Sequence, residues 1–410
     1  MNRRHALLGS AALFGAGKAR AQAPDLARGL WRDERGCFGV GAFPEFGAGL
    51  FGFDYDSLAV GPLRPAAARR WLMAGSLDGA APPEEMIGLE DGRLVVGQRR
   101  LSPLIVERRG FKVQTNGVSL SAEIASVRGA PIRGAVLMIY GSGPAPKEAF
   151  DPWALWFLSE GLAVVAYDKR GSGQSTGDWR LTSLEDLAAD ATAVLKAFRS
   201  ESRTGPVFAW GASQGGWILP QLGAARVLDG LIMHAGAVTT PAGQILEQVV
   251  YSLKPYGFDQ AEIDRATAYY ALDIDVSRGR RPWSEIAAAY KAATAADAQW
   301  ILEPPPSADA PERTMIKIMA DFDPTPYWRA NARPVLAVYG AKDWIVPAET
   351  NLPRLRQIVS PRADLTAKVI PEANHLMFIA KSGERDEYAK LSRFSPDYFR
   401  AMRTWLSRQT

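Results

Sequence analysis

The sequence predicts an α/β protein with a mostly parallel sheet, a helical insertion and a small β-rich unit in front. From about residue 110, continuous apolar runs alternate with segments of helical spacing, as in strands buried on both faces. Earlier residues show short strand-like runs separated by Asp-Gly turns. Residues of about 237–328 contain helical segments and no buried-strand run, which predicts a helical lid over the strand ends.

Residues 1–23 have the layout of an export signal. Arg3 and Arg4 precede a mildly apolar run at residues 6–16, and residues 21–23 are the small-residue motif Ala-Gln-Ala. The paired arginines favour the twin-arginine route, which predicts a periplasmic or secreted protein. An uncleaved membrane anchor is the less favoured alternative because the apolar run is too short to span a bilayer. No later run is long enough to be a transmembrane segment.

Charge and cysteine content argue against several classes of partner. The chain has 48 Lys and Arg against 44 Asp and Glu, but four of the basic residues lie in the predicted signal. The remainder is formally neutral and has no basic stripe interleaved with aromatics, so we expect no nucleic-acid partner. Cys37 is the single cysteine, and no Cys/His cluster has zinc spacing. We therefore expect no disulfide within the chain, no metal and no organic cofactor, and the oligomeric state stays open.

Residues 24–109 are predicted to form the β-rich N-terminal domain. Candidate strands lie at residues 68–74, 93–98 and 103–108. We interpret the frequent aromatic residues as core, with substrate binding at the mouth of the main domain as the alternative. Apolar/polar alternation on both sides of Asn116-Gly117 is a strong hairpin signal, and it opens the main domain, residues 110–410.

The main domain is predicted to alternate strands and helices. Strands are expected at residues 135–140, 162–167, 207–210, 230–234, 334–339 and 365–370. Helices are expected at residues 152–160, 184–198, 217–227, 353–359 and 398–406, with further helices of the lid near 244–253, 261–271, 283–296 and 312–319. This order indicates a parallel sheet covered by helices on both faces.

Gly211, Ser213 and Gly215 form a Gly-x-Ser-x-Gly signature between a predicted strand and a predicted helix. In that context the signature indicates a nucleophile elbow, a sharp turn that lifts the serine oxygen above the sheet. We expect the two glycines to be needed because Cβ atoms there would clash. The alternative interpretation is a Gly/Ser-rich turn without chemistry.

A serine hydroxyl needs a base to become a nucleophile, and the base needs an acid that orients it. His375 follows the predicted strand at residues 365–370, and Asp343 follows the one at 334–339. Together with Ser213 they leave the carboxyl ends of strands, where the sites of open α/β sheets lie. We therefore predict Ser213 as nucleophile, His375 as base and Asp343 as acid.

Each partner has a competitor. His234 ends the strand directly after the elbow unit, and we interpret it as a packed or site-lining histidine. Asp321 and Asp323 precede Pro324, and we interpret them as turn or cap residues.

The chain order of serine, aspartate and histidine resembles the α/β-hydrolase superfamily, over roughly residues 111–410. Residues 340–347, Gly-Ala-Lys-Asp-Trp-Ile-Val-Pro, resemble the acid loop of that superfamily with one extra residue before the acid. Residues 168–175, Asp-Lys-Arg-Gly-Ser-Gly-Gln-Ser, are similar to a loop of secreted bacterial esterases and serine-peptidase-like hydrolases. The resemblance implies that this last loop is structural.

The oxyanion hole is expected to consist of two backbone N–H groups. One belongs to Gln214, whose side chain is expected to be incidental, and the other to Ser142. The resemblance implies His-Gly-x-Gly before the second donor, where this chain has Tyr140 in place of histidine. The backbone donor is retained by that change.

The expected function is an exported serine hydrolase that cleaves a small carboxylic ester through an acyl-enzyme. A serine aminopeptidase or acyl-peptide hydrolase acting on short peptides is the first alternative. It would require an acidic group that binds a substrate amine, for which Glu247, Asp264 and Asp273 are candidates. A non-catalytic binding protein on a hydrolase scaffold is the second alternative, and it predicts a damaged triad.

Overall fold

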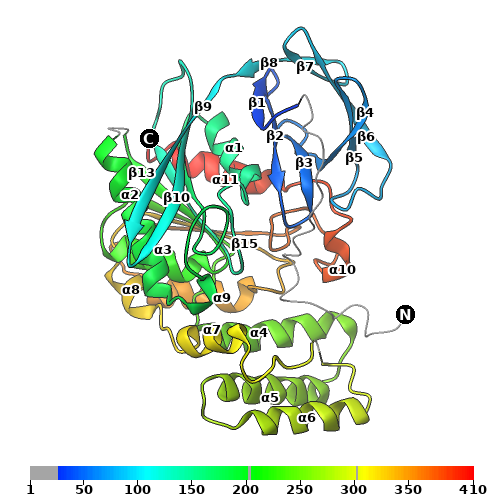
Figure 1. Cartoon of the computed structure of the whole chain (residues 1–410), viewed down its shortest axis with the longest axis vertical. Coiled ribbons are helices and arrows are strands. Elements are labelled where there is room, and N and C mark those ends of the chain that lie inside the picture. The colour runs from blue at the N-terminus through cyan, green and yellow to red at the C-terminus, as the bar shows by residue number, and fades with distance from the viewer. Residues whose placement is uncertain (1–25, 202–204, 302) are drawn as a thin grey trace.

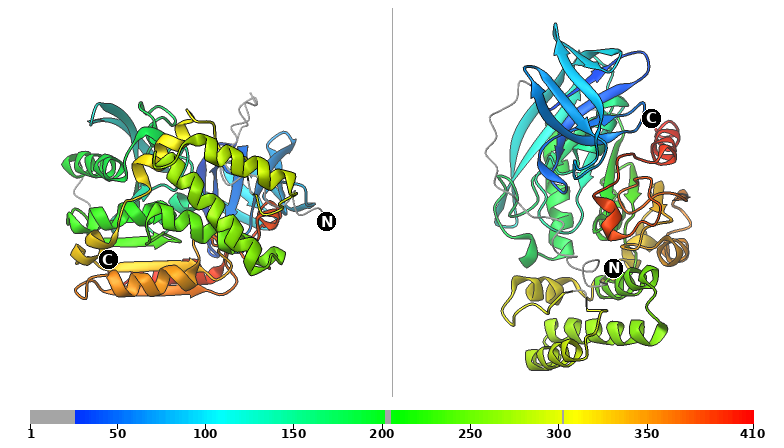
Figure 2. Two further views of the ribbon diagram at one scale, coloured as in Figure 1. Left: turned by 90° about the horizontal axis from the view of Figure 1, so that it is seen from below. Right: turned by 90° about the vertical axis from the view of Figure 1, so that its right-hand side faces the viewer.

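The computed structural model describes residues 26–201, 205–301 and 303–410, so the predicted export signal lies outside the described residues. The chain folds into a closed β-barrel, an eight-stranded sheet covered by helices, and a helical insertion (Figure 1). The barrel and the inserted helices lie at opposite ends of the long axis of the molecule (Figures 1 and 2).

Eight antiparallel strands close the barrel. They are β1 (Gly29–Arg32), β2 (Cys37–Phe43), β3 (Gly47–Asp54), β4 (Val60–Ala67), β5 (Arg70–Ala74), β6 (Pro83–Glu90), β7 (Arg93–Val96) and β8 (Arg99–Leu104). Successive side chains of a strand point to opposite faces. In β2, Phe38 and Val40 accordingly join the barrel core, whereas Cys37 and Phe43 join the core of the sheet domain. The N-terminal aromatic residues are therefore core residues, but of two different cores.

Strand β2 packs directly on helix α1 (Asp151–Ser159). Gly41 lies so close to this helix that a Cβ atom there would be 2.7 Å from Asp151 Oδ2, so the approach requires glycine. The same carboxylate accepts a hydrogen bond from the Ala42 backbone N–H at 2.8 Å and pairs with Arg28. Fully buried Asp151 thus joins the barrel to the sheet domain.

The main sheet has the strand order β16-β15-β14-β13-β11-β12-β10-β9. Its strands are β9 (Val106–Thr115), β10 (Val118–Val127), β11 (Ala135–Ile139), β12 (Ala163–Tyr167), β13 (Val207–Ala212), β14 (Gly230–His234), β15 (Val335–Gly340) and β16 (Leu365–Ile370). The pairings from β12 to β16 are parallel, while β9 and β10 are antiparallel additions, so the sheet is mixed.

The hairpin of β9 and β10 turns at Asn116-Gly117 as expected, and both residues have positive φ, 42° and 75°. The strand predicted at residues 103–108 is instead divided between β8 and β9. Leu104 pairs with Leu30 and closes the barrel, whereas Val106 pairs with Val127 in the main sheet. Because the apolar pattern continues across the junction, only the long-range pairing reveals the division.

Helices cover both faces of the sheet, as predicted. Besides α1, the helices of the sheet domain outside the insertion are α2 (Leu184–Glu201), α3 (Gly215–Ala224), α8 (Thr325–Ala330), α9 (Ala348–Ile358), the short α10 (Arg385–Tyr388) and α11 (Pro396–Leu406). Trp210 of β13 stacks on Trp153 of α1 and bonds to Tyr398 of α11, while its neighbour Gly211 faces Leu219 of α3. Helices α1 and α11 therefore lie on one face and α3 on the other.

Helix α9 begins at Ala348 and runs through Pro353, where the prediction placed its first residue. Proline usually marks a helix start because it lacks an N–H and clashes with the preceding turn. In this helix, Leu352 and Leu355 lie on either side of Pro353 in the sequence, and both are buried in the core.

The insertion consists of α4 (Pro241–Leu253), α5 (Gln260–Ser277), α6 (Trp283–Ala295) and α7 (Pro311–Met319). These helices have a core of their own that includes Leu253, Ala266 and Ile286. Helix α8, within the stretch expected to be lid, packs against α3 in the body of the sheet domain. Among the described helices, none is both long and apolar enough to cross a membrane.

Candidate active site

Ser213, Asp343 and His375 follow the carboxyl ends of strands β13, β15 and β16. These strands belong to one parallel array, in which Ala212 pairs with His234 and Gly340 pairs with Ile370. Parallel strands present their carboxyl ends at a common edge. The three predicted residues are therefore gathered at one edge of the sheet.

Ser213 occupies a strained turn between β13 and α3. Its φ of 52° lies in the left-handed region, which costs a non-glycine residue about 1–3 kcal/mol. A Cβ at Gly211 would lie 2.8 Å from Leu219 Cγ, as the elbow hypothesis expected. A Cβ at Gly215 would meet only ordinary contacts from 3.6 Å, whereas one at Gly216 would lie 2.5 Å from the Ala237 backbone nitrogen. The second crowded glycine is thus Gly216 rather than Gly215.

Asp343 and His375 are in direct contact. His375 Nδ1 lies 2.8 Å from Asp343 Oδ2, and both residues are buried. Asp343 Oδ1 accepts hydrogen bonds from the backbone N–H groups of Ile345 at 2.8 Å and Val346 at 2.9 Å. Both oxygens of the Asp343 carboxylate therefore have hydrogen-bond partners. His375 is held through Nδ1, which leaves its Nε2 for proton transfer.

The environment of His375 favours its charged form. Burial lowers the pKa of His375, but the charge and hydrogen bond of Asp343 and the charge of Glu45 raise it, and the net pKa lies above its usual 6.5. A general base works when it is unprotonated. We therefore expect activity to rise with pH through this raised pKa.

Glu45 was missed by the sequence analysis. It lies in the turn between barrel strands β2 and β3. Phe43, the last residue of β2, stacks on Phe378 with ring centroids 6.4 Å apart. Burial, partly offset by the nearby charge of His375, raises the pKa of Glu45 to about 7. The barrel thus brings a carboxyl group close enough for its charge to act on His375, more than 300 residues away in sequence, and no local pattern signals this proximity.

Glu45→Gln should move the acidic limb of the kcat/KM profile to lower pH. Loss of this negative charge removes one influence that raises the pKa of His375, so the neutral base persists to more acidic pH. The measurement is kcat/KM for a neutral ester between about pH 5 and pH 9, compared with the exposed control Glu34→Gln. A limb that stays in place, or moves to higher pH, would contradict the assignment.

His234 is buried and links Ser213 to His375, consistent with its interpretation as a packed or site-lining residue. Its backbone carbonyl accepts from the Ser213 N–H at 3.0 Å. Its Nε2 lies 2.9 Å from the His375 carbonyl oxygen and therefore donates, so Nδ1 accepts from Tyr398 at 2.8 Å. Burial and the charge of His375 lower the pKa of His234 to about 3, which keeps the ring neutral.

Tyr398→Phe should destabilise the protein by about 1–3 kcal/mol, because the buried Nδ1 of His234 loses its donor. Trp210 Nε1, which donates to the same hydroxyl at 3.0 Å, loses its acceptor as well. Urea unfolding measures the difference against Tyr327→Phe, a partly buried control. Equal stability of the two variants would contradict this role of the Tyr398 hydroxyl.

The predicted oxyanion loop lies against the elbow. A Cβ at Gly141 would be 3.5 Å from Ser213 Cβ, so the peptide that carries the Ser142 N–H is next to the nucleophile. Tyr140 is buried and stacks on Phe150, which gives it a packing role. Gln214 is buried at the start of α3, and its side-chain oxygen accepts a hydrogen bond from Lys169 at 2.7 Å. The side chain was expected to be incidental, but it has a buried partner.

Two residues of the loop after β12, Asp168 and Ser172, make structural hydrogen bonds, in keeping with what the resemblance implied for them. Asp168 accepts hydrogen bonds from the backbone N–H groups of Lys147 at 2.7 Å and Gln174 at 2.8 Å. Ser172 Oγ accepts from the Ala145 N–H at 2.9 Å. These bonds attach residues 145–147, which follow the oxyanion loop, to the body of the sheet.

The competing acids have other partners. Asp321 pairs with Arg278 and Arg280, and Asp323 caps the first turn of α8. The candidate amine-binding residues of the insertion are also engaged: Glu247 bonds to Thr350 and Asn351, Asp264 to Gln260, and Asp273 to Arg313. Among the described residues, no group of three or more His, Cys, Asp or Glu side chains is placed to hold a metal ion.

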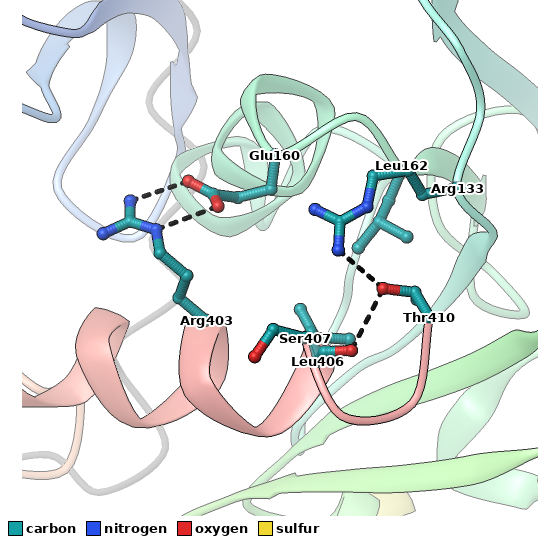
Figure 3. Close-up of a pocket in the computed structure, with 7 residues that line it drawn as sticks. All are labelled: Arg133, Glu160, Leu162, Arg403, Leu406, Ser407 and Thr410. Carbon is teal, nitrogen blue, oxygen red and sulfur yellow. Dashed lines mark hydrogen bonds and ion pairs between the residues drawn. The ribbon is translucent and has the colours of Figure 1, made fainter.

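A small pocket lies at the opposite edge of the sheet, where Leu162 precedes β12 (Figure 3). It is bordered by the ion pair of Arg403 with Glu160 at 2.7 Å and the hydrogen bond of Arg133 to Thr410 at 2.7 Å. Its cavity of about 30 Å³ holds about one water molecule. The pocket is therefore separate from the catalytic edge.

A protein-family model described as "Serine aminopeptidase, S33" matches residues 130–381. The bifunctional esterase/perhydrolase DCH of Acinetobacter calcoaceticus is 32% identical over 87 residues, which cover 21% of this chain and 30% of that relative. The chain thus matches less than a third of that protein's length.

Similar solved structures include an esterase of Pyrococcus furiosus, with 14% identity and a TM-score of 0.45 over 74% of this chain and 90% of that chain. Est1E from Butyrivibrio proteoclasticus with bound ferulic acid has 14% identity and a TM-score of 0.46 over 73% and 98% of the two chains. A serine hydrolase involved in carbazole degradation has 20% identity and a TM-score of 0.43 over 74% and 100%.

Proposed function

The chain belongs to the serine aminopeptidase S33 family of the α/β-hydrolase superfamily, and we propose that it is an exported serine hydrolase that cleaves a carboxylic ester. The observation that carries the proposal is the buried contact of His375 with Asp343 at the sheet edge where Ser213 occupies a left-handed elbow. Export is proposed from residues 1–23 alone.

The proposed reaction has two halves. Ser213 Oγ attacks the substrate carbonyl carbon while its proton passes to His375 Nε2, and the carbonyl oxygen becomes an oxyanion. The backbone N–H groups of Ser142 and Gln214 hold this oxyanion. When the tetrahedral intermediate collapses, the alcohol leaves with the proton from His375, and the acyl group remains on Ser213.

Water then releases the acyl group. His375 accepts a proton from a water molecule whose oxygen attacks the acyl carbon, and the second intermediate expels Ser213 Oγ, which takes the proton back. The products are a carboxylic acid and an alcohol. The role of Asp343 is to orient Nδ1 and to stabilise the imidazolium.

A fluorophosphonate probe followed by peptide mass mapping tests the proposal. The expected result is a single adduct on Ser213, together with turnover of p-nitrophenyl esters of short or medium chain length. A folded protein that is neither labelled nor active would favour the alternative of a non-catalytic binding protein.

An aminopeptidase is a second candidate because of Glu45. The protonated amine of a peptide N-terminus would pair with this carboxylate, and the pairing would favour the ionised form of a group whose pKa is raised by burial. The test compares neutral esters with aminoacyl p-nitroanilides. If the aminopeptidase is correct, Glu45→Gln raises KM for the anilides and leaves KM for the esters unchanged. Turnover of esters alone would exclude it.

A further inference from the structure

The Lys169 side chain connects the two predicted halves of the oxyanion hole. Lys169 follows β12, is 3% exposed, and donates from Nζ to the Gly141 carbonyl at 2.9 Å and the Gly143 carbonyl at 3.2 Å. Its third bond goes to Gln214 Oε1 at 2.7 Å. All three ammonium hydrogens are therefore used, two on the oxyanion loop and one on the residue after the nucleophile.

The bond to Gly141 controls the direction of a proposed catalytic donor. The carbonyl of Gly141 and the N–H of Ser142 belong to one planar trans peptide, so they point in opposite directions. When Lys169 holds the carbonyl, it therefore also aims the Ser142 N–H. A hydrogen bond to the carbonyl further polarises the peptide and strengthens its N–H as a donor.

Burial of the charged Lys169 side chain costs free energy, which argues against a purely structural role. A buried ammonium is costly unless an opposite charge compensates it, and no ion pair to Lys169 is formed within the described part of the chain. The neighbouring Asp168 carboxylate instead binds Lys147 and two backbone N–H groups. The Trp179 ring, 5.3 Å from Nζ, gives partial compensation. Burial lowers the pKa of Lys169 to about 7.

We propose that Lys169 is the positioning residue of the oxyanion hole. It holds the segments that carry the Ser142 N–H and the Gln214 N–H in the relative positions needed to bind one oxyanion. This inference rests on the proposed function, since it assigns a role within the same site. Lys169 does not touch substrate. It acts through the Gly141–Ser142 peptide, whose carbonyl it holds, and through the side chain of Gln214. Its loss should reduce the stabilisation of the transition state more than that of the ground state.

Lys169→Met tests the proposal, because methionine retains an unbranched side chain and removes every donor. We expect kcat for a p-nitrophenyl ester to fall about 10²-fold, near the loss of one oxyanion donor, while KM changes less than about threefold. The inhibition constant of a boronic acid, which places an oxygen in the oxyanion hole, should rise in the same proportion as kcat falls. The matched control is exposed Lys196→Met on α2, with unchanged kcat.

Gln214→Met is a second variant, which removes the side-chain acceptor but keeps the backbone N–H. By itself it should lower kcat while KM changes little, and where Lys169→Met also folds, the two effects on kcat should be less than additive. Thermal melting separates misfolding from mispositioning.

The inference would be overturned if folded Lys169→Met kept the wild-type kcat and boronate affinity, or if its effect were fully additive with that of Gln214→Met. In that case, ester turnover by the wild-type protein would still support the proposed function. A folded wild-type protein that hydrolyses no ester or amide and takes up no fluorophosphonate would overturn both.

Discussion

Replacing Ser213 by alanine is expected to lower kcat for a p-nitrophenyl ester by about 10⁶-fold, the scale seen when a triad nucleophile is removed. The elbow presents this side chain in a left-handed turn next to the oxyanion loop, so the substitution removes the proposed nucleophile. Substrate affinity should change little, because the backbone donors remain.

The measurement pairs steady-state kinetics with fluorophosphonate labelling, which should disappear. Stability should not fall, since Ser213 contributes its backbone N–H and carbonyl to the turn and both persist in alanine. Ser200→Ala, an exposed position near the end of α2, is the matched control and should retain full activity. If Ser213→Ala keeps more than about a tenth of wild-type kcat, the nucleophile is another residue.

Asp343→Asn should lower kcat by about 10⁴-fold with little change in fold. The reason lies in the two oxygens of Asp343. Oδ1 accepts from two backbone N–H groups, so the amide oxygen of asparagine must occupy that position and its NH₂ group must face His375. Nδ1 of His375 would then become the acceptor, and the proton would move to Nε2, the atom that must accept from Ser213.

Asp321→Asn is the control, because this carboxylate pairs with Arg278 and Arg280 on the insertion and should not affect kcat. Circular dichroism and thermal melting of Asp343→Asn should resemble the wild type, since volume and backbone bonds are kept. A variant that retains near-wild-type kcat would show that His375 takes its tautomer from another partner.

Much of the fold was accessible to pattern analysis. The buried strands of the parallel array, the hairpin at Asn116-Gly117 and the helices of the insertion have strong local periodicity or turn chemistry. The resemblance to the α/β-hydrolase superfamily is confirmed by the family match. The predicted boundaries of helices and strands were less accurate at two places. At Pro353 the helix continues through a residue that usually marks a helix start, and at Ile105 a continuous apolar pattern crosses the junction of two domains.

The candidate site was only partly accessible. Ser213, Asp343 and His375 follow strand ends in a recognisable order, and their grouping requires only that parallel strands end at one edge. Glu45 has no such signal, and the strand-end positions of His234 and Lys169 do not indicate which groups they contact. Their roles depend on contacts between segments far apart in sequence, such as the bond of His234 to the His375 carbonyl, 141 residues away.

Residue order and local chemistry were therefore sufficient for the type of fold, for the sharp turn at Ser213 and for a candidate triad whose members lie at one edge of the sheet. These properties depend on backbone preference and burial, which each segment expresses on its own. Three-dimensional packing was needed for the closed barrel, for Gly216 as the second crowded glycine, and for the bridge that Lys169 makes between Gly141 and Gln214. Which buried polar groups become partners depends on distances that only the folded chain defines.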